Sequence, residues 1–313
     1  MTRAVVFAYH NVGARCLRVL RAHGVDVPLV VTHADDPGEE CWFERVSDVA
    51  EDLGLAWIAH DDPNAPDIVA RIAALAPDFL FSFYYRRMLG LAVLALPRSG
   101  ALNLHGSLLP RYRGRAPVNW AVLNGETETG ATLHVMTARA DAGDVVDQEA
   151  VPIGPDDTAG EVQARVCDAA VRVLERQLDA LASARAPRRP QDASRATTFG
   201  RRRPEDGAFE WSRPAAEIHN LVRAVSHPYP GAFAPHAGRT LYVWRTRNGG
   251  WSANGAQPGE MRVIDDCLYV ACGGPDTQWL EIVRGQIEGD VERDGADLAR
   301  HLAPHTSTTP QAT

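Results

Sequence analysis

The sequence lacks lysine altogether, so that all 32 of its basic residues are arginine. Genome-level codon bias is the simplest reason for such a composition. The absence nevertheless has a chemical consequence, because catalysis through a Schiff base commonly needs a lysine amine. Mechanisms that use a Schiff-base lysine are therefore excluded, and any phosphate clamp has to use arginine.

Cysteine and long apolar runs are also scarce. The five cysteines are odd in number and scattered, and none of them forms a CxxC pair: Cys16, Cys41, Cys167, Cys267 and Cys272. We therefore expect neither a disulfide framework nor a zinc knuckle, and no metal site. The first apolar run ends at Ala8, which is too short for a signal peptide or a membrane span. We expect a cytoplasmic protein that does not insert into a membrane.

Positive charge is in deficit, with 40 acidic residues and a net charge of −8. The deficit is uneven along the chain. Residues 185–203 hold seven arginines and one acid, a net +6, whereas residues 204–313 hold nine arginines and fourteen acids, a net −5. An acidic surface disfavours binding to a phosphate backbone. Nucleic acid is therefore not expected as a partner.

The first half of the chain has the pattern of an α/β layer fold. Short apolar runs alternate with segments whose apolar residues recur every three or four positions, as in helices that cover a mostly parallel sheet. The expected strands are residues 3–8, 25–32, 55–58, 78–83 and 100–104. This order predicts a doubly wound, Rossmann-like domain.

Beyond residue 130 the pattern changes. Two extended segments, 131–136 and 145–153, follow each other without a helix between them. Thr158 and Glu161 then form a capping-box pattern at the start of a long amphipathic helix. A first domain is therefore expected over residues 1–184.

The rest of the chain is expected to form a linker, a small β domain and a tail. Residues 185–203 are a basic segment marked by proline. One helix over 215–225 is followed by closely spaced short apolar runs, which are typical of a small β-barrel over 204–300. Residues 301–313 are expected to be disordered.

Three residues at or beyond the carboxyl end of the expected strand 100–104 are candidates for catalysis. Asn103 and His105 lie two apart at the carboxyl end of this strand, so their side chains share a face at the edge where open α/β sheets build sites. An imidazole transfers protons near neutral pH, and a carboxamide donates to a developing oxyanion. Asp141, in a glycine-punctuated loop, would favour the imidazolium and orient the ring. Each alone is more often structural, but together with the Gly- and Pro-rich loop 106–117 they predict an active site.

These residues resemble the signature of formyltransferases that use N10-formyltetrahydrofolate. The signature is the pattern Asn-x-His-x-Ser-Leu-Leu-Pro over 103–110 with Asp141 downstream. The run 110–117, Trp120 and residues 124–126 resemble the branch that holds methionyl-tRNA formyltransferase and the sugar-nucleotide N-formyltransferases. The chain is most similar to the members that formylate UDP-4-amino-4-deoxy-L-arabinose in lipid A modification and polymyxin resistance. The blocks that carry this likeness are 7–10, 32–39, 81–86, 125–130, 139–143 and 199–202.

The resemblance, which spans about residues 3–285, implies a catalytic domain followed by an OB-like domain. It implies N10-formyltetrahydrofolate as cosubstrate and a UDP-amino sugar as acceptor. His105 would be the general acid and base, and Asn103 would stabilise the tetrahedral oxyanion. Asp141 would favour the protonated form of His105. The residues implied for the folate groove are Arg87, Met88, Leu89, Arg115, Thr137, Ala138, Arg139, Ala140 and Asp141. At Thr137 and Ala138 the family often has bulkier or charged side chains, so contacts there are expected from the backbone.

The acceptor site is less well defined by the sequence. No GxGxxG follows the first strand, so neither NAD nor flavin is expected. Candidate acceptor residues are Tyr9, His10, Tyr84, Arg86, Arg201 and Arg202. The last two are suited to a bidentate diphosphate clamp, although a solvated linker charge run would have the same pattern.

Several alternatives stay open. The acceptor in the same chemistry could be methionyl-tRNA, which the acidic C-terminal part disfavours, or another amino sugar linked to dTDP or GDP. A non-catalytic nucleotide-sugar or folate-binding module is a further alternative. Many resembling enzymes carry a fused domain that decarboxylates UDP-glucuronic acid, with its own glycine fingerprint. The sequence ends at Thr313 without that fingerprint, so a separate decarboxylase polypeptide is expected.

Overall fold

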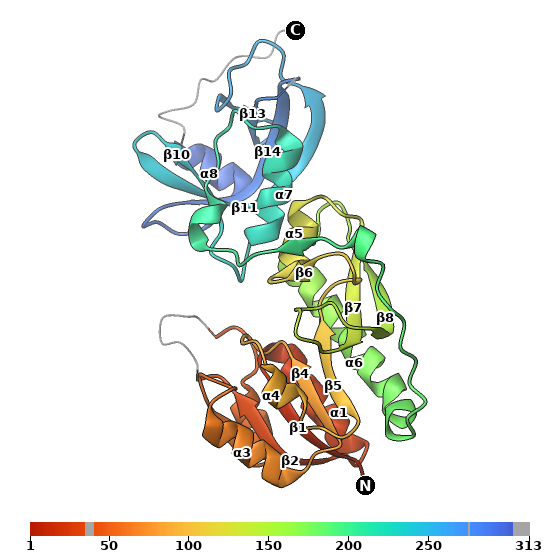
Figure 1. The fold of residues 1–313 in the computed structure, drawn as a ribbon. Coiled ribbons are helices and arrows are strands. Elements are labelled where there is room, and N and C mark those ends of the chain that lie inside the picture. The colour runs from red at the N-terminus through yellow and green to blue at the C-terminus, as the bar shows by residue number, and fades with distance from the viewer. Residues whose placement is uncertain (35–40, 275, 303–313) are drawn as a thin grey trace. The chain divides into compact units, whose positions relative to one another are not determined.

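A computed structural model describes residues 1–34, 41–274 and 276–302. The chain forms two compact units (Figure 1). The first consists of residues 1–117, 128–152 and 163–200, and the second of residues 118–127, 153–162 and 201–313. Residues 303–313 of the expected tail, and 35–39 of the quoted block 32–39, lie outside the described residues.

The first unit is built on a seven-stranded sheet in the order β3-β2-β1-β4-β5-β7-β8. The strands are β1 (Arg3–Ala8), β2 (Asp26–Thr32), β3 (Trp57–Ala59), β4 (Phe79–Phe83), β5 (Gly100–His105), β7 (Glu128–Val135) and β8 (Val145–Pro152). The first five pair in parallel, whereas β7 and β8 are antiparallel. The prediction of a doubly wound sheet is confirmed, and the two extended segments after residue 130 complete the same sheet.

Helices cover both faces of this sheet (Figure 1). They are α1 (His10–Ala22), α2 (Val46–Asp52), α3 (Pro66–Leu75), α4 (Leu91–Leu94) and α6 (Ala159–Ala182). Ile72 of α3 and Val93 of α4 pack with Leu80 of β4 in one core cluster. The neighbouring strand residues Phe79 and Phe81 point to the other face, where they lie beside Leu178 of α6. Successive side chains of β4 therefore point to opposite faces of the sheet, and both faces are buried.

The expected cap of the long helix is present. The Thr158 backbone N–H donates to Glu161 Oε2 at 2.7 Å, and the Glu161 N–H donates to Thr158 Oγ1 at 3.3 Å. These reciprocal bonds satisfy two N–H groups that helix geometry leaves unpaired. The capping box therefore explains why α6 begins at Ala159.

The segment 185–200 is bonded to the first unit and is not a free connection. Arg189 and Val145 exchange two backbone hydrogen bonds of 2.8 and 2.9 Å. The short strand β9 (Thr198–Phe199) pairs in parallel with β6 (Arg113–Gly114), and η1 (Ala193–Arg195) lies between these contacts. We call residues 185–200 the strap. The domain boundaries predicted around it stay predictions.

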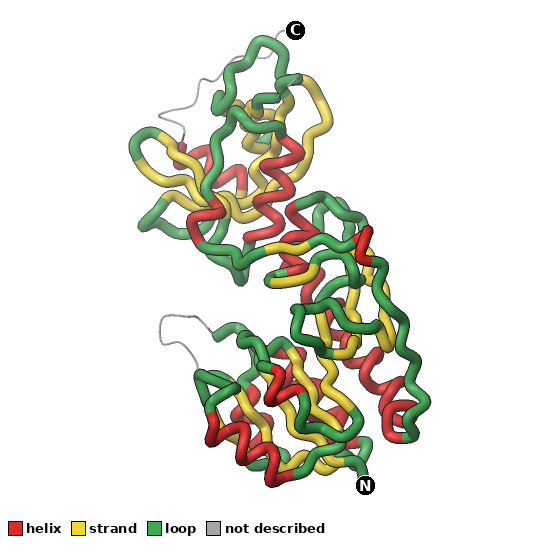
Figure 2. Tube along the Cα trace, viewed as in Figure 1, coloured by secondary structure: helices red, strands yellow, loops and turns green. Residues whose placement is uncertain are grey.

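The second unit carries an antiparallel sheet in the order β10-β11-β14-β13-β12, with β15 beside β14. Its strands are among the yellow segments toward the C-terminus in Figure 2. Its elements are η2 (Pro204–Gly207), α7 (Ala215–Val225), β10 (Ala232–His236), β11 (Arg239–Ser252), β12 (Met261–Ile264), β13 (Cys267–Cys272), β14 (Gln278–Ile287), β15 (Arg293–Asp294) and α8 (Gly295–Leu302). A further helix, α5 (Pro117–Leu123), leads into residues 118–127. The closely spaced apolar runs after residue 225 contribute the strands of this sheet, and α7 has the expected bounds. The closure of the sheet into an OB-like barrel stays a prediction.

None of the described helices is both long enough and apolar enough to cross a membrane. The five cysteines are free thiols, and Cys16, Cys167 and Cys272 are buried.

Candidate active site

Strand β5 carries two of the three expected catalytic residues, and strand pairing fixes their surroundings. In the register of the sheet, Asn103 lies opposite Ser82 of β4 and His134 of β7, and His105 lies opposite Thr132. Because β5 pairs with β4 on one side and with β7 on the other, its side chains lie beside residues of both neighbouring strands. Asn103 contacts His134, and both His134 and His105 face Asp141, so the side chains of Asn103 and His105 lie at the same site.

His105 is buried, with 7% of its side chain exposed. Its Nε2 atom lies 2.7 Å from the carbonyl oxygen of Tyr112. A carbonyl only accepts hydrogen bonds, so Nε2 carries a proton and donates it to Tyr112. Nδ1 faces Asp141 Oδ1 at 3.6 Å, which is too long for a hydrogen bond. In the neutral ring, Nδ1 therefore holds the lone pair that is able to take up a proton.

Asp141 lies on the loop between β7 and β8, and its carboxylate faces His105 of β5 and His134 of β7. Its Oδ2 accepts the backbone N–H of Gly114 at 2.8 Å, and its Oδ1 lies 3.6 Å from His105 Nδ1 and 3.5 Å from His134 Nε2. Burial alone would raise the pKa of Asp141. In their charged forms the imidazoles of His105 and His134, together with the Gly114 N–H, outweigh burial and hold this pKa well below its ordinary value. Asp141 is therefore an anion throughout the neutral range.

His134 is a member of the site that the sequence did not single out. Its side chain is 2% exposed, and its Nε2 lies 3.0 Å from Asn103 Nδ2. Its own strand shows only an extended pattern. The signal that places it here is the antiparallel register between β5 and β7, which depends on tertiary pairing.

The backbone around the site is strained. Tyr112 has φ 58° and Asp141 has φ 52°, values in the left-handed region that residues with a side chain rarely adopt. Tyr84, His10 and Ala116 share this conformation, with φ of 57°, 65° and 50°. Such residues persist only where the surrounding structure holds them, and they cluster at functional sites. Tyr112 and Asp141 are the two residues that face the nitrogens of His105.

The strap holds both of these strained positions through hydrogen bonds. The sequence did not indicate these hydrogen bonds. Gln191 Nε2 donates to the carbonyl oxygens of Asp141 and Gly143 at 2.8 and 2.7 Å. Gln191 Oε1 accepts from the guanidinium of Arg113 at 3.2 and 2.6 Å. The Tyr112 N–H donates to Thr197 Oγ1 at 2.8 Å. No local pattern in the basic segment indicates these contacts.

The residues implied for the folate groove lie on three loops of the first unit. Met88 is 56% exposed, whereas Leu89 is 2% exposed and packs in the core cluster with Val93. Only the backbone of Leu89 is thus left for a ligand. Arg87, Arg115 and the run Thr137, Ala138, Arg139 and Ala140 are exposed. These placements leave their binding role as a prediction.

Four of the acceptor candidates lie together after β1 and β4. Arg86 places its guanidinium carbon 4.5 Å from the ring centre of Tyr9, and its backbone N–H donates to His33 Nε2 at 3.0 Å. The rings of His10 and Tyr84 lie 6.1 Å apart. His33, which stacks on Tyr85 at 4.0 Å, joins this cluster. Burial, with Arg86 and Arg87, lowers the pKa of His33 to about 4, so its ring is neutral at pH 7.

The remaining two acceptor candidates belong to the second unit. Arg201 is exposed. The Arg202 guanidinium lies 4.9 Å from the ring centre of Trp120, and its Nη2 donates to the Asp206 carbonyl at 3.1 Å. Arg202 is thus held by its own unit. A diphosphate clamp at this pair stays a prediction.

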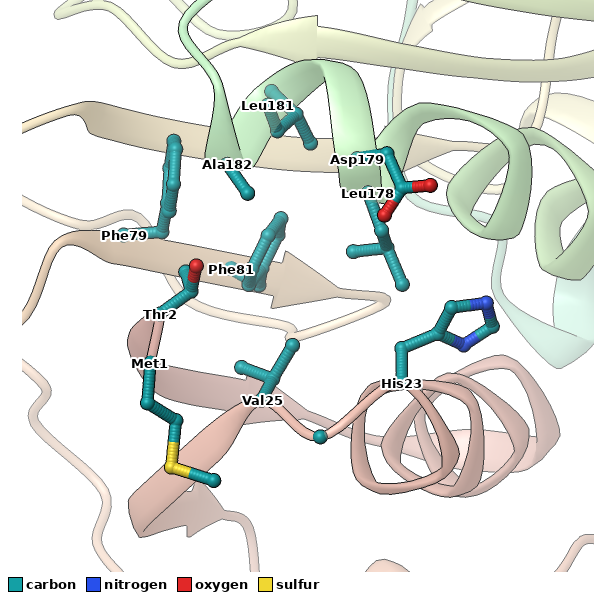
Figure 3. A pocket seen from close by; sticks show the side chains of 11 residues that line it. Met1, Thr2, His23, Val25, Phe79, Phe81, Leu178, Asp179, Leu181 and Ala182 are labelled. Atoms are coloured by element: carbon teal, nitrogen blue, oxygen red, sulfur yellow. The ribbon is translucent and has the colours of Figure 1, made fainter.

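A cavity of ≈ 190 Å³ opens at the other end of the strands in the first unit (Figure 3). Phe79, Phe81, Leu178 and Leu181 give it an apolar lining, with His23 and Asp179 beside them. It holds none of the catalytic candidates. Across residues 1–34, 41–274 and 276–302, no cluster of three or more His, Cys, Asp or Glu side chains is suited to a metal ion.

Comparison with known families matches the chain at both ends. Residues 3–178 match the family described as formyl transferase, and residues 202–302 match the formyl transferase C-terminal domain. Together the two matches cover most of the described chain.

Solved structures share the fold. An N-formyltransferase from Helicobacter canadensis, in complex with folinic acid and dTDP-3-aminofucose, is 17% identical with a TM-score of 0.69 over 90% of this chain and 99% of that chain. WlaRD, a sugar 3N-formyl transferase with dTDP and 5-N-formyl-THF, is 17% identical to this chain. Its TM-score is 0.69, and the match covers 93% of this chain and 99% of that chain. HypX from Aquifex aeolicus, in complex with tetrahydrofolic acid, is 16% identical with a TM-score of 0.63 over 99% of this chain and 49% of that chain.

Proposed function

Since the chain belongs to the formyl transferase family, we propose that it transfers the formyl group of N10-formyltetrahydrofolate to the 4-amine of UDP-4-amino-4-deoxy-L-arabinose. The observation that carries this proposal is the convergence of a carboxamide, an imidazole and a buried carboxylate at β5. Asn103, His105 and Asp141 come from two segments 36 residues or more apart, and binding alone would not require this trio.

His105 would move the protons of the reaction. The sugar amine attacks the formyl carbon, and the carbon–nitrogen bond to N10 of the folate breaks. Nδ1 of His105 holds a lone pair that accepts a proton from the attacking amine, while Nε2 stays anchored on Tyr112. The same proton is then delivered to N10, so that tetrahydrofolate leaves as a neutral amine and the product is a formamide.

Asn103 and Asp141 would stabilise the charges that develop. As the amine adds, the formyl oxygen becomes an oxyanion, and an N–H of the Asn103 carboxamide is suited to donate to it. The His105 ring becomes an imidazolium, and the Asp141 carboxylate 3.6 Å away offsets its charge. Because Asp141 is already ionised and buried, this stabilisation is in place before the reaction begins.

The groove residues fit a folate cosubstrate. The exposed guanidinium groups of Arg87, Arg115 and Arg139 are suited to the carboxylates of a glutamyl tail. Met88 offers exposed apolar surface for the ring system. Folate ligands in the structures of WlaRD and the Helicobacter canadensis enzyme support this assignment.

The proposal is tested with the purified full chain and N10-formyltetrahydrofolate. Amino sugars linked to UDP, dTDP and GDP, and methionyl-tRNA, are offered in parallel, and the formylated product is measured by mass spectrometry. We expect product with UDP-4-amino-4-deoxy-L-arabinose, loss of turnover in His105→Ala, and binding of the UDP-sugar within a few fold. Ligand binding without product from any acceptor would instead make the chain a binding module.

A dTDP-linked amino sugar is the second candidate acceptor, because the two sugar formyltransferases described above were crystallised with dTDP or a dTDP-sugar. The same panel separates the candidates by kcat/KM. The net −5 of residues 204–313 supports a sugar nucleotide over tRNA. A role in lipid A modification follows only if the UDP-sugar is preferred.

A further inference from the structure

The contact between Asn103 and His134 gives the second histidine a function of its own. We propose that His134 is a positioning residue, whose neutral imidazole holds the Asn103 carboxamide with its NH₂ group toward the place where the oxyanion forms. This inference rests on the proposed function, because it concerns how Asn103 is prepared for the same reaction.

The hydrogen bonds of His134 assign its protons. Nδ1 lies 2.9 Å from the carbonyl oxygen of Val135, which only accepts, so Nδ1 carries a proton. In a neutral ring Nε2 then holds a lone pair and accepts. Asn103 Nδ2 lies 3.0 Å from Nε2, and a carboxamide donates only through its nitrogen. The hydrogen bond to the Nε2 lone pair therefore fixes the amide of Asn103 with its nitrogen toward His134.

This orientation decides what Asn103 offers to a ligand. The amide nitrogen carries two hydrogens, and one of them is used by His134. The other is left for an acceptor, and Asn103 is only partly buried, so a substrate is able to reach it. If the amide were turned over, its oxygen would face the Nε2 lone pair, and the amide would repel the oxyanion at short range. His134 thus selects the rotamer that donates.

Asp141 is the group that competes for His134. Its Oδ1 lies 3.5 Å from Nε2, farther than the Asn103 nitrogen. A protonated Nε2 would donate to Asp141 and lose its role as acceptor for Asn103. The other ring that faces His134 is His105, at 6.4 Å between centres. A neutral His134 leaves the Asp141 carboxylate to act on His105.

Two replacements separate the acceptor from the packing of the side chain. His134→Leu keeps a similar volume without an acceptor, and His134→Gln restores an acceptor oxygen that is able to reach Asn103. We expect kcat to fall about 10- to 100-fold in H134L, with KM for both substrates within about threefold, and to recover to within about fivefold of wild type in H134Q. Thr129→Val is the matched control, because Thr129 is buried on the same strand and its Oγ1 has no partner among the described residues.

A double-mutant cycle and a spectrum complete the test. If His134 acts through Asn103, then H134L adds little to the loss in Asn103→Ala. In ¹⁵N-histidine NMR, we expect a protonated Nδ1 and an unprotonated Nε2 for His134, whatever the acceptor sugar turns out to be. A wild-type kcat in H134L, equal losses in H134L and H134Q, additive losses with Asn103→Ala, or a protonated Nε2 would each overturn the inference. Turnover by the wild type with a silent Asn103→Ala would instead contradict the proposed function.

Discussion

The two ends of the parallel strands in the first unit carry opposite chemistry. Strand β4 shows the contrast within a few residues, because Phe79 at its start lines the apolar cavity and Tyr84 after its end joins the cluster of Tyr9, His10 and Arg86. Parallel strands all end at the same edge, so the loops that follow them converge there. The carboxyl edge is therefore where side chains from several segments meet, and the other end serves packing.

Backbone conformation makes the same distinction. At the start of β4, the left-handed residue Ala76 (φ 46°) ends helix α3, which is an ordinary way to close a helix. Tyr112 and Asp141 lie in loops where no helix end explains their conformation. The strap bonds to both of them, and His105 also donates to the Tyr112 carbonyl. In the first unit, left-handed residues outside helix ends therefore mark the candidate active site, whereas the cavity lies away from it.

Among the replacements that test this contrast, the largest effect is expected for Asp141→Asn. It keeps the shape of the side chain and removes the charge that stabilises the His105 imidazolium, so kcat should fall by about 100-fold or more. Asp144→Asn, on the same loop, is the control and should stay within about twofold. Steady-state kinetics on both proteins measure the difference. Equal kcat values for the two variants would show that the buried carboxylate has no catalytic role.

The next effect is expected for Gln191→Ala in the strap. It removes the donors that hold the carbonyls of Asp141 and Gly143 and the acceptor for Arg113, so we expect kcat to fall by about tenfold. Asp192→Ala is the neighbouring control, because the Asp192 carboxylate accepts from Ser194 within its own turn. A loss confined to thermal stability would mean that the strap merely supports the fold.

A smaller effect concerns the pH dependence of stability. The pKa of His33 is about 4 in the folded chain, whereas an unfolded histidine has about 6.5. Between these values the unfolded chain binds more protons, so the free energy of unfolding falls as the pH falls from about 6.5 to about 4. His33→Gln should reduce the loss between pH 7 and pH 5 by on the order of 1 kcal/mol. Chemical denaturation at the two pH values measures it, and an unchanged difference would contradict the neutral His33.

The smallest effect is expected at the apolar end. Val25→Ile adds one methylene group toward the cavity, where Val25 is buried beside Phe81. We expect turnover within twofold of wild type and a change in the free energy of unfolding of less than about 1 kcal/mol. Activity assays with denaturant titration test this. A large loss of turnover would show that the two ends of the strands are coupled.

Local patterns carried much of the fold. The strands of the first unit overlap the expected ranges. The helix over 215–225 and the capping box at Thr158 and Glu161 lie where the sequence places them. Each depends on residues within a few positions of one another, because helix and strand periods and caps are local. Asn103 and His105 share a face for the same reason. The charge of residues 204–313 also follows from composition alone.

Only the tertiary structure decided which side chains contact these residues. His134 meets Asn103 through the register of β5 and β7, and Gln191 reaches Asp141 from a basic segment that resembles a linker in sequence. Register and loop closure join positions that are tens of residues apart, and they are set by the packing of the whole sheet. The sequence by itself thus indicated the candidate catalytic residues and their family, whereas tertiary packing determined the hydrogen bonds that surround His105 and His134.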